Sequence, residues 1–411
     1  MLRTLAGQVK EFKRDSFLTP VFMILEVVVE TLIPLLMARI VDEGIGKGNM
    51  QTILLTGLMM VGLALAGLFT GAAGGYFGAQ ASTGFARNLR KAMFENIQTF
   101  SFSNIDKFST SGLVTRLTTD VTNLQNAYQM LLRMFVRAPF SMIVAMVMAF
   151  IINARIASVY LVAVIALAIF LGFVMVRATR YFRMVFEKYD ALNESVQENV
   201  TGIRVVKAYV REEYEGNKFA TAAANIYNLF VRAEYNIIIN MPVMQGTVYV
   251  VILIISWLGA HMIVAGDLTT GELMSLLAYC MNILMSLMMV AMVFVMVTMS
   301  SASAERISEV LNEVSDLRNP EDPVYEVKDG QVDFNHVNFS YRQGSGEFVL
   351  RDIDLHIKSG ETIGIIGGTG SAKSSLVNLI SRLYDVTEGS LEVGGLDVRA
   401  YDMDSLRNQV A

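Results

Sequence analysis

The sequence predicts an α-helical membrane protein with six spans, followed by the start of an α/β domain that carries a phosphate-binding loop. Three observations predict this fold class. The 411-residue chain is 53% hydrophobic and only 17% charged, whereas soluble chains carry about 25% charged residues. Six apolar stretches are long enough to cross a bilayer, which takes about twenty helical residues. After the last stretch, the pattern changes to short strands around a glycine-rich turn.

The spans alternate with short and long connections. Loops one, three and five are short, whereas loops two and four are long and basic. Basic residues concentrate in cytoplasmic loops, so we expect the N-terminus, both long loops and the exit of the last span on the cytoplasmic side. The expected spans are residues 18–40, 53–80, 134–153, 156–176, 242–264 and 272–299.

The long loops repeat apolar residues at helical spacing, as at Leu192, Val196 and Val200. We therefore expect helices that project from the membrane, each broken by a short turn, with Gly112 and Gly202 as turn markers. The expected domains are an amphipathic N-terminal elbow at 1–17, a membrane domain at 18–311, a linker at 312–329 and an incomplete α/β domain at 330–411. Within that domain we expect strands at 331–334, 337–341, 349–357, 362–366 and 391–393, and a helix at 374–384.

The composition excludes several kinds of site. The chain has one cysteine, Cys280, so no disulfide forms within it, and its three histidines are scattered. A metal site built from His and Cys is therefore not expected. The basic loop residues set the topology and touch anionic lipid headgroups, so no nucleic-acid partner is expected. There is no cleavable signal peptide pattern at the N-terminus.

The segment from Thr362 to Ser375 reads as an apolar strand, a glycine-rich turn and the start of a helix. Backbone amides in such a turn cradle phosphate oxygens, and the helix N-terminus adds a partial positive charge. Lys373 would reach the outer phosphates, and the Ser374 hydroxyl would coordinate Mg²⁺. A glycine-rich turn without a ligand is the alternative, but it leaves the Lys-Ser pair unexplained. The candidate nucleotide-binding residues are Gly367, Gly368, Thr369, Gly370, Ser371, Ala372, Lys373, Ser374 and Ser375, with Ser374 as the metal ligand.

The order of these parts resembles the ATP-binding-cassette (ABC) exporter family, in its half-transporter form, over the whole chain. The resemblance is carried by four segments: 104–120 and 192–213 in the long loops, 303–311 after the last span, and Phe339-Ser340-Tyr341. It implies that Tyr341 stacks on adenine, with an ordinary surface aromatic as the alternative. It also implies that the first long loop contacts the chain's own nucleotide domain, and that residues near 201–211 contact the partner's.

The resemblance implies one half of a dimeric machine in a plasma membrane, in particular a bacterial inner membrane. It would use ATP and Mg²⁺ to export a hydrophobic or amphipathic drug, lipid or peptide by alternating access. A truncated, non-hydrolysing subunit or an inert fragment that only dimerises with an intact partner is the main alternative. An ATP-gated channel or regulator is a weaker one, and six spans exclude a soluble enzyme.

Two departures from the family pattern stand out. Ala372 replaces the usual glycine before the lysine, which costs about 1 kcal/mol if its φ is positive and nothing if its φ is helical. The family's glutamine loop, signature sequence, catalytic glutamate and switch histidine do not occur in the 411 residues. Phosphoryl transfer needs all these parts in place. We therefore assign no catalytic residue, and expect weak nucleotide binding at most and no hydrolysis by this chain alone.

Two features of the spans have open alternatives. Glu26 and Glu30 lie on one face of the first span, where they either attract a cationic substrate or pair with a basic residue or water. The last span carries a methionine stripe, which either forms an adaptable substrate-binding wall or packs and contacts lipid in the ordinary way. Its members are Met281, Met285, Met288, Met289, Met292, Met296 and Met299.

Overall fold

The computed structural model describes residues 1–341 and 347–410, without the side chains of residues 182, 183, 186, 187, 190 and 191. The chain divides into two compact units. The first unit comprises Met1–Glu11, Thr83–Asn126 and Met299–Ala411, and the second comprises Phe12–Ser82 and Ala127–Thr298. Some of the long helices have residues in both units.

Among the described residues, six helical segments are long and apolar enough to cross a membrane, and each contains one expected span. The prediction of six spans is therefore confirmed. The segments are Leu2–Ile45, Met50–Gln98, Thr110–Ile152, Ala154–Tyr181, Glu212–Ala265 and Thr270–Asn312. The helices that form them are α2 (Lys13–Arg39), α3 (Met50–Gln98), α6 (Val121–Ile152), α7 (Ala154–Thr201), α9 (Glu212–Ile238), α10 (Asn240–Ala265) and α11 (Thr270–Asn312).

Small residues and buried tyrosines bring the helices of the second unit together. A Cβ added to Gly74 of α3 would lie 2.3 Å from the Met23 side chain of α2, so only glycine allows this approach. Close approach at small residues is how helices pack in lipid. The hydroxyls of Tyr160 and Tyr279 donate to the carbonyls of Leu276 and Thr31, at 2.9 and 2.7 Å. Buried tyrosines thus fasten α7 to α11 and α11 to α2.

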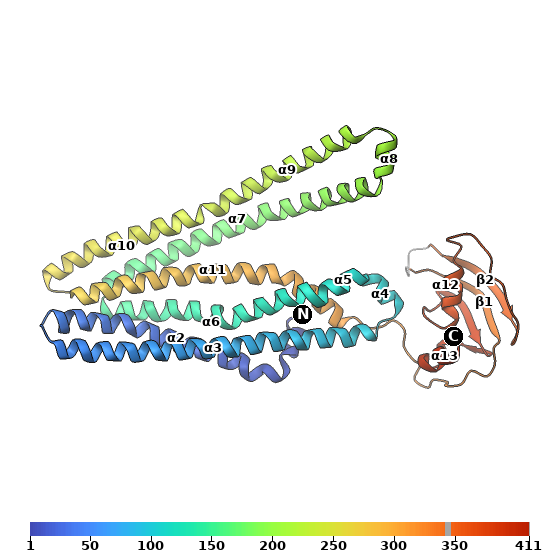
Figure 1. Cartoon of the computed structure of the whole chain (residues 1–411), viewed down its shortest axis with the longest axis horizontal. Coiled ribbons are helices and arrows are strands. Elements are labelled where there is room, and N and C mark those ends of the chain that lie inside the picture. The colour runs from blue at the N-terminus through green and yellow to red at the C-terminus, as the bar shows by residue number, and fades with distance from the viewer. Residues whose placement is uncertain (342–346, 411) are drawn as a thin grey trace. The chain divides into compact units, whose positions relative to one another are not determined.

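The long loops are helical, as the periodicity predicts. In the second unit α7 runs beside α9, and the short helix α8 (Ile203–Ala208) joins them at the tip, as Figure 1 shows. Gly202 ends α7 and precedes α8, as expected. The expectation for Gly112 is wrong, because Gly112 lies inside α5 (Thr110–Thr115). The break falls at Ser109, whose φ is +56° and whose hydroxyl accepts the Gly112 amide at 3.1 Å, capping α5.

The α/β part of the first unit is built on a four-stranded antiparallel sheet of order β2-β1-β3-β4. Its strands are β1 (Val332–Phe339), β2 (Leu350–Ile357), β3 (Glu388–Val393) and β4 (Leu396–Asp397); its helices are α12 (Lys373–Ile380) and α13 (Met403–Gln409). β1 joins two expected strands through an irregular register near His336, whose φ is +48°. Phe334, Leu379 and Tyr401 lie fully buried in its core.

Two expectations for this part are wrong. Residues 362–366 form no strand, because no strand of the described chain pairs with them and a strand needs a neighbour's hydrogen bonds. Ile366 is accordingly 97% exposed. The helix expected at 374–384 ends at Ile380, where Ser381 leaves the helical conformation. The short β4 and α13 were not expected.

Candidate functional site

The candidate phosphate loop is an exposed, irregular turn that leads into α12. Every residue from Glu361 to Ser371 is exposed. Within the described chain, the backbone amides of Gly368, Thr369 and Gly370 donate to no acceptor. A Cβ added to Gly367 would lie 2.5 Å from the Ser371 hydroxyl, so the turn requires glycine there. Free amides at the start of a helix are the donors that an anion binds.

Ala372 occupies the position just before α12 in a left-handed conformation, with φ +60° and ψ +21°. The preceding Gly370 also has a positive φ, of +87°. The left-handed region costs a residue with a Cβ about 1 kcal/mol or more. The sequence left open whether the φ of Ala372 is positive or helical. It is positive, so the backbone of Ala372 is strained.

The Lys373 ammonium turns back into its own loop. Its Nζ donates to the carbonyls of Gly367 and Gly368 at 3.0 and 2.8 Å, and to the Ser371 hydroxyl at 3.2 Å. An ammonium in this place neutralises an anion held by the turn, so the expected pairing with phosphate needs only a small movement of a flexible side chain.

Tyr341 lies beside the phosphate loop, although 34 residues separate it from Ser375. The Tyr341 and Ser375 hydroxyls are 2.7 Å apart and share a hydrogen bond. Ser375 is buried, whereas the neighbouring Ser374 is exposed. The structure thus brings the expected adenine platform and the expected phosphate loop together, and Tyr341 is 43% exposed.

The sequence analysis missed the residues that hold Tyr341. The rings of Phe339 and Tyr384 pack edge-on against it, with centroids 4.8 and 5.1 Å away. The Tyr384 hydroxyl donates at 3.0 Å to Asp106 of α4 (Phe102–Phe108), 278 residues earlier. Burial, and then the Asp106 carboxylate, raise the pKa of Tyr384 to about 12. The sequence signal was an aromatic residue at the expected end of the phosphate-loop helix, residue 384.

The residues fit Mg²⁺ only together with a nucleotide. The described chain has no group of three or more His, Cys, Asp or Glu side chains that would hold a metal. Mg²⁺ prefers one or two protein oxygens plus phosphates and waters. The exposed Ser374 hydroxyl supplies one such oxygen, so the expected role of Ser374 stays a prediction.

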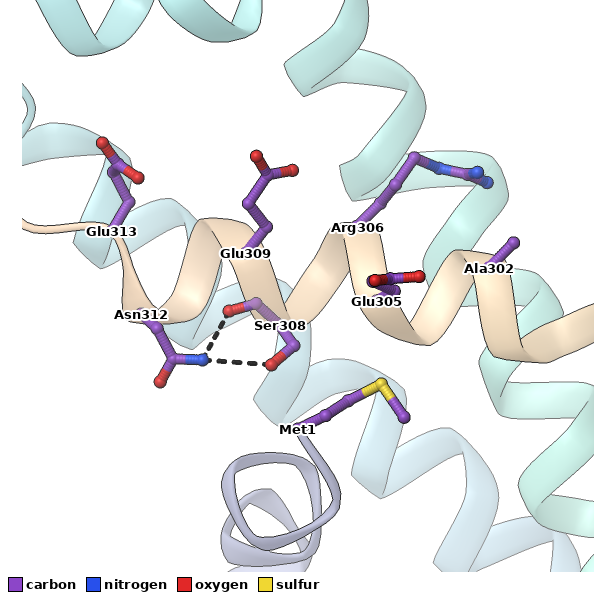
Figure 2. A pocket seen from close by; sticks show the side chains of 8 residues that line it. All are labelled: Met1, Ala302, Glu305, Arg306, Ser308, Glu309, Asn312 and Glu313. Atoms are coloured by element: carbon purple, nitrogen blue, oxygen red, sulfur yellow. Dashed lines mark hydrogen bonds between the residues drawn. The ribbon is translucent and has the colours of Figure 1, made fainter.

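A pocket of about 720 Å³ lies elsewhere, between Met1 and the end of α11 (Figure 2). Three carboxylates line it, those of Glu305, Glu309 and Glu313. Glu309 pairs with Arg116 at 2.9 Å and Glu313 with Lys107 at 2.8 Å. Arg306 also lines this pocket, so its charges are mixed. None of the candidate nucleotide-binding residues lines it.

The two acidic residues of the first span have a basic partner. Arg137 of α6 reaches Glu30 at 2.9 Å and Glu26 at 3.5 Å. The Glu26 carboxylate also lies close to Gly71 of α3, since a Cβ added there would be 3.1 Å from the carboxylate. The expected pairing with a basic residue is therefore present, but one arginine balances only one of the two carboxylates, and the Glu26 Oε2 atom is buried without a hydrogen-bond partner within the described chain.

The methionine stripe of α11 divides between two environments. Met281, Met285, Met292 and Met299 are 45–73% exposed within this chain, whereas Met288 packs against the buried core. An exposed methionine face suits an adaptable apolar surface. Met288 thus follows the packing alternative, whereas exposure fits both a substrate-binding wall and lipid contact for the other four.

Two family models match the chain. The model of the ABC transporter transmembrane region covers residues 16–288, and that of the ABC transporter covers residues 350–411. An uncharacterized ABC transporter ATP-binding protein of Bacillus subtilis is 33% identical over 407 residues, 97% of this chain and 71% of that protein. Another, of Mycobacterium tuberculosis, is 33% identical over 408 residues, 99% of this chain and 70% of that protein. An ATP-dependent lipid A-core flippase of Hahella chejuensis is 25% identical over 359 residues, 87% and 61% of the two chains.

Proposed function

The chain belongs to the ABC transporter family, and on this premise we propose that it is one half of a dimeric, ATP-driven exporter of amphipathic substrates. Six membrane helices precede the candidate phosphate loop in the same chain. The observation that carries the proposal is the meeting of Tyr341 with this loop, at 2.7 Å from Ser375. An aromatic platform beside free amides and an ammonium matches the adenine and the phosphates of ATP.

The substrate class is the finer part of the proposal. One protein that this chain resembles is named an ATP-dependent lipid A-core flippase, and we infer an amphipathic lipid-like substrate by analogy. The exposed methionines of α11 would provide the apolar contact for such a molecule. Arg137 pairs with both Glu26 and Glu30, so the group keeps one net negative charge, and the proposal does not depend on a cationic substrate.

The two long loops would connect ATP binding to the membrane helices. The hydrogen bond from Tyr384 to Asp106 supports contact between the first loop and the chain's own nucleotide domain. At the tip of the second loop, Val205, Tyr209 and Val210 are 60–81% exposed. Exposed apolar residues at a loop tip mark a contact surface, and we assign this one to a second exporter half.

The test measures binding of a fluorescent ATP analogue to the purified chain in detergent. We expect saturable binding that Lys373→Ala weakens at least about tenfold, as removal of a charged phosphate contact does. Ser374→Ala should remove the effect of Mg²⁺ on affinity and leave metal-free binding intact. Lys358→Ala, which removes an exposed lysine outside the loop, is the control. Binding that Lys373→Ala leaves unchanged would contradict the proposal.

A further inference from the structure

The first long loop, between the second and third spans, contacts the end of α11 and the start of the segment expected as a linker (residues 312–329). The Asn96 side chain of α3 donates to the carbonyls of Val310 and Glu313, at 2.7 and 2.9 Å. The last carbonyls of a helix have no partner within it, so Asn96 supplies the missing donor. The α11 helix therefore ends against another helix rather than in solvent.

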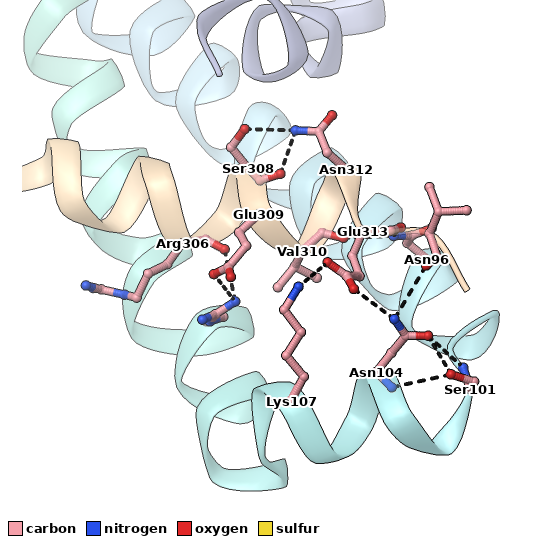
Figure 3. A network of polar contacts seen from close by, with 12 residues as sticks. Asn96, Ser101, Asn104, Lys107, Arg306, Ser308, Glu309, Val310, Asn312 and Glu313 are labelled. Atoms are coloured by element: carbon pink, nitrogen blue, oxygen red, sulfur yellow. Dashed lines mark hydrogen bonds and ion pairs between the residues drawn. The ribbon is translucent and has the colours of Figure 1, made fainter. Parts of the chain in front are cut away.

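Two acidic side chains continue this attachment, as Figure 3 shows for Glu313. Glu313 accepts from Lys107 and from Asn104, both at 2.8 Å. Asp316 accepts from the hydroxyls of Ser101 and Ser103. Burial raises the pKa of Asp316, but these hydrogen bonds outweigh it and hold the pKa below its usual value. The chain is thus fastened to the first loop as far as Asp316.

From Arg318 onward, the same segment is fastened to the α/β domain. The guanidinium of Arg382, only 4% exposed, donates to the Arg318 carbonyl at 3.2 Å. Asn319 accepts the amide of Met403 at 3.0 Å. Val324 forms a parallel bridge with Tyr401, through the hydrogen bonds Val324 N to Ala400 O at 3.0 Å and Asp402 N to Val324 O at 2.9 Å.

Only Leu317 separates the two attachments, and it is itself buried. We propose that residues 312–324 form a rigid connection between the first long loop and the nucleotide domain, instead of a flexible tether. Leu317 is the single residue between the two sets of attachments. A movement of the nucleotide domain then reaches α11 and the first loop together. A flexible linker would absorb part of that movement in its own freedom.

The test compares two insertions of equal length in the full chain. Spin labels are placed at Thr110→Cys in the first loop and Lys358→Cys in the α/β domain, with the buried native cysteine replaced by Cys280→Ser. Gly-Ser is inserted at one of two places. The first is after Leu317, between the two sets of attachments. The second is after Glu321, between Asn319 and Val324, which both attach to the α/β domain. Electron-spin resonance then measures the distribution of distances between the labels.

We expect a narrow distribution in the parent and in the Glu321 insertion. The Leu317 insertion frees about three residues and should broaden the distribution by about 10 Å. Equal broadening by both insertions would show a tether, and broadening by neither would show that the segment carries no constraint; either result overturns the proposal. Asp316→Ala, which removes an attachment without changing the length, should broaden the distribution as well, whereas Glu321→Ala should not.

Discussion

At the scale of single residues, Ala372 is where the sequence and the backbone disagree. Its φ of +60° suits glycine. Ala372→Gly should therefore stabilise the loop by about 0.5–1 kcal/mol, because the relief of strain exceeds the entropy that glycine loses on folding.

Hydrogen exchange of the Ser371 and Leu376 amides, which donate to the Gly368 and Ala372 carbonyls at 3.3 and 3.0 Å, measures this effect. We expect Ala372→Gly to slow exchange about two- to fivefold, the range that this free energy corresponds to. The matched control is Ala224→Gly on the exposed face of α9, where the same replacement should speed local exchange. Unchanged exchange in the loop would mean that the left-handed conformation is not populated.

At the scale of elements, the attachment of the first loop to α11 depends on carboxylates. Asp120 is buried and accepts from Arg306 at 2.7 Å and Ser303 at 2.8 Å (Figure 3 shows Arg306 on α11). Burial raises the pKa of Asp120, but the hydrogen bonds and charge of Arg306 outweigh it and leave the pKa lowered. A lowered pKa in the folded state stabilises the fold above the unfolded-state value, near 4.

This stabilisation is lost as the pH falls through the folded-state pKa. Amide exchange at the end of α11, in residues 306–312, should thus rise more steeply below about pH 4 than intrinsic exchange predicts. The Asp120→Asn, Asp316→Asn double variant should lack that extra rise, because neither side chain titrates. If the variant and the parent show the same pH profile, the carboxylates do not hold the loop.

How far the sequence predicts such elements depends on the range of the interactions. Local periodicity located the spans and the helical loops, because a helix is formed by residues close in sequence. It failed at Ser109 and at residues 362–366, where a side-chain cap and the lack of a pairing strand decide the structure. Tyr341 and Ser375 were named separately, but their contact, and the support from Tyr384, depend on tertiary packing.

At the scale of the whole molecule, the basic long loops predict the orientation in the membrane, and the single native cysteine makes that prediction testable. Cys280 is buried, so a polar maleimide should not label the parent chain. Tyr209, at the tip of the second long loop, is 75% exposed. Lys47, in the first short loop, is also exposed. The two positions should lie on opposite sides of the membrane, because three of the six expected spans separate them.

Tyr209→Cys should be labelled from outside only in inverted vesicles, and Lys47→Cys only in intact cells or right-side-out vesicles. The physical reason is that loops rich in Lys and Arg stay on the cytoplasmic side. Labelling of both positions from one side would contradict the count of spans between them. If each position were labelled from the side opposite to the expected one, the count of spans would hold but the orientation would be inverted. The nucleotide loop would then lie on the side where ATP is scarce, which would contradict an ATP-driven exporter.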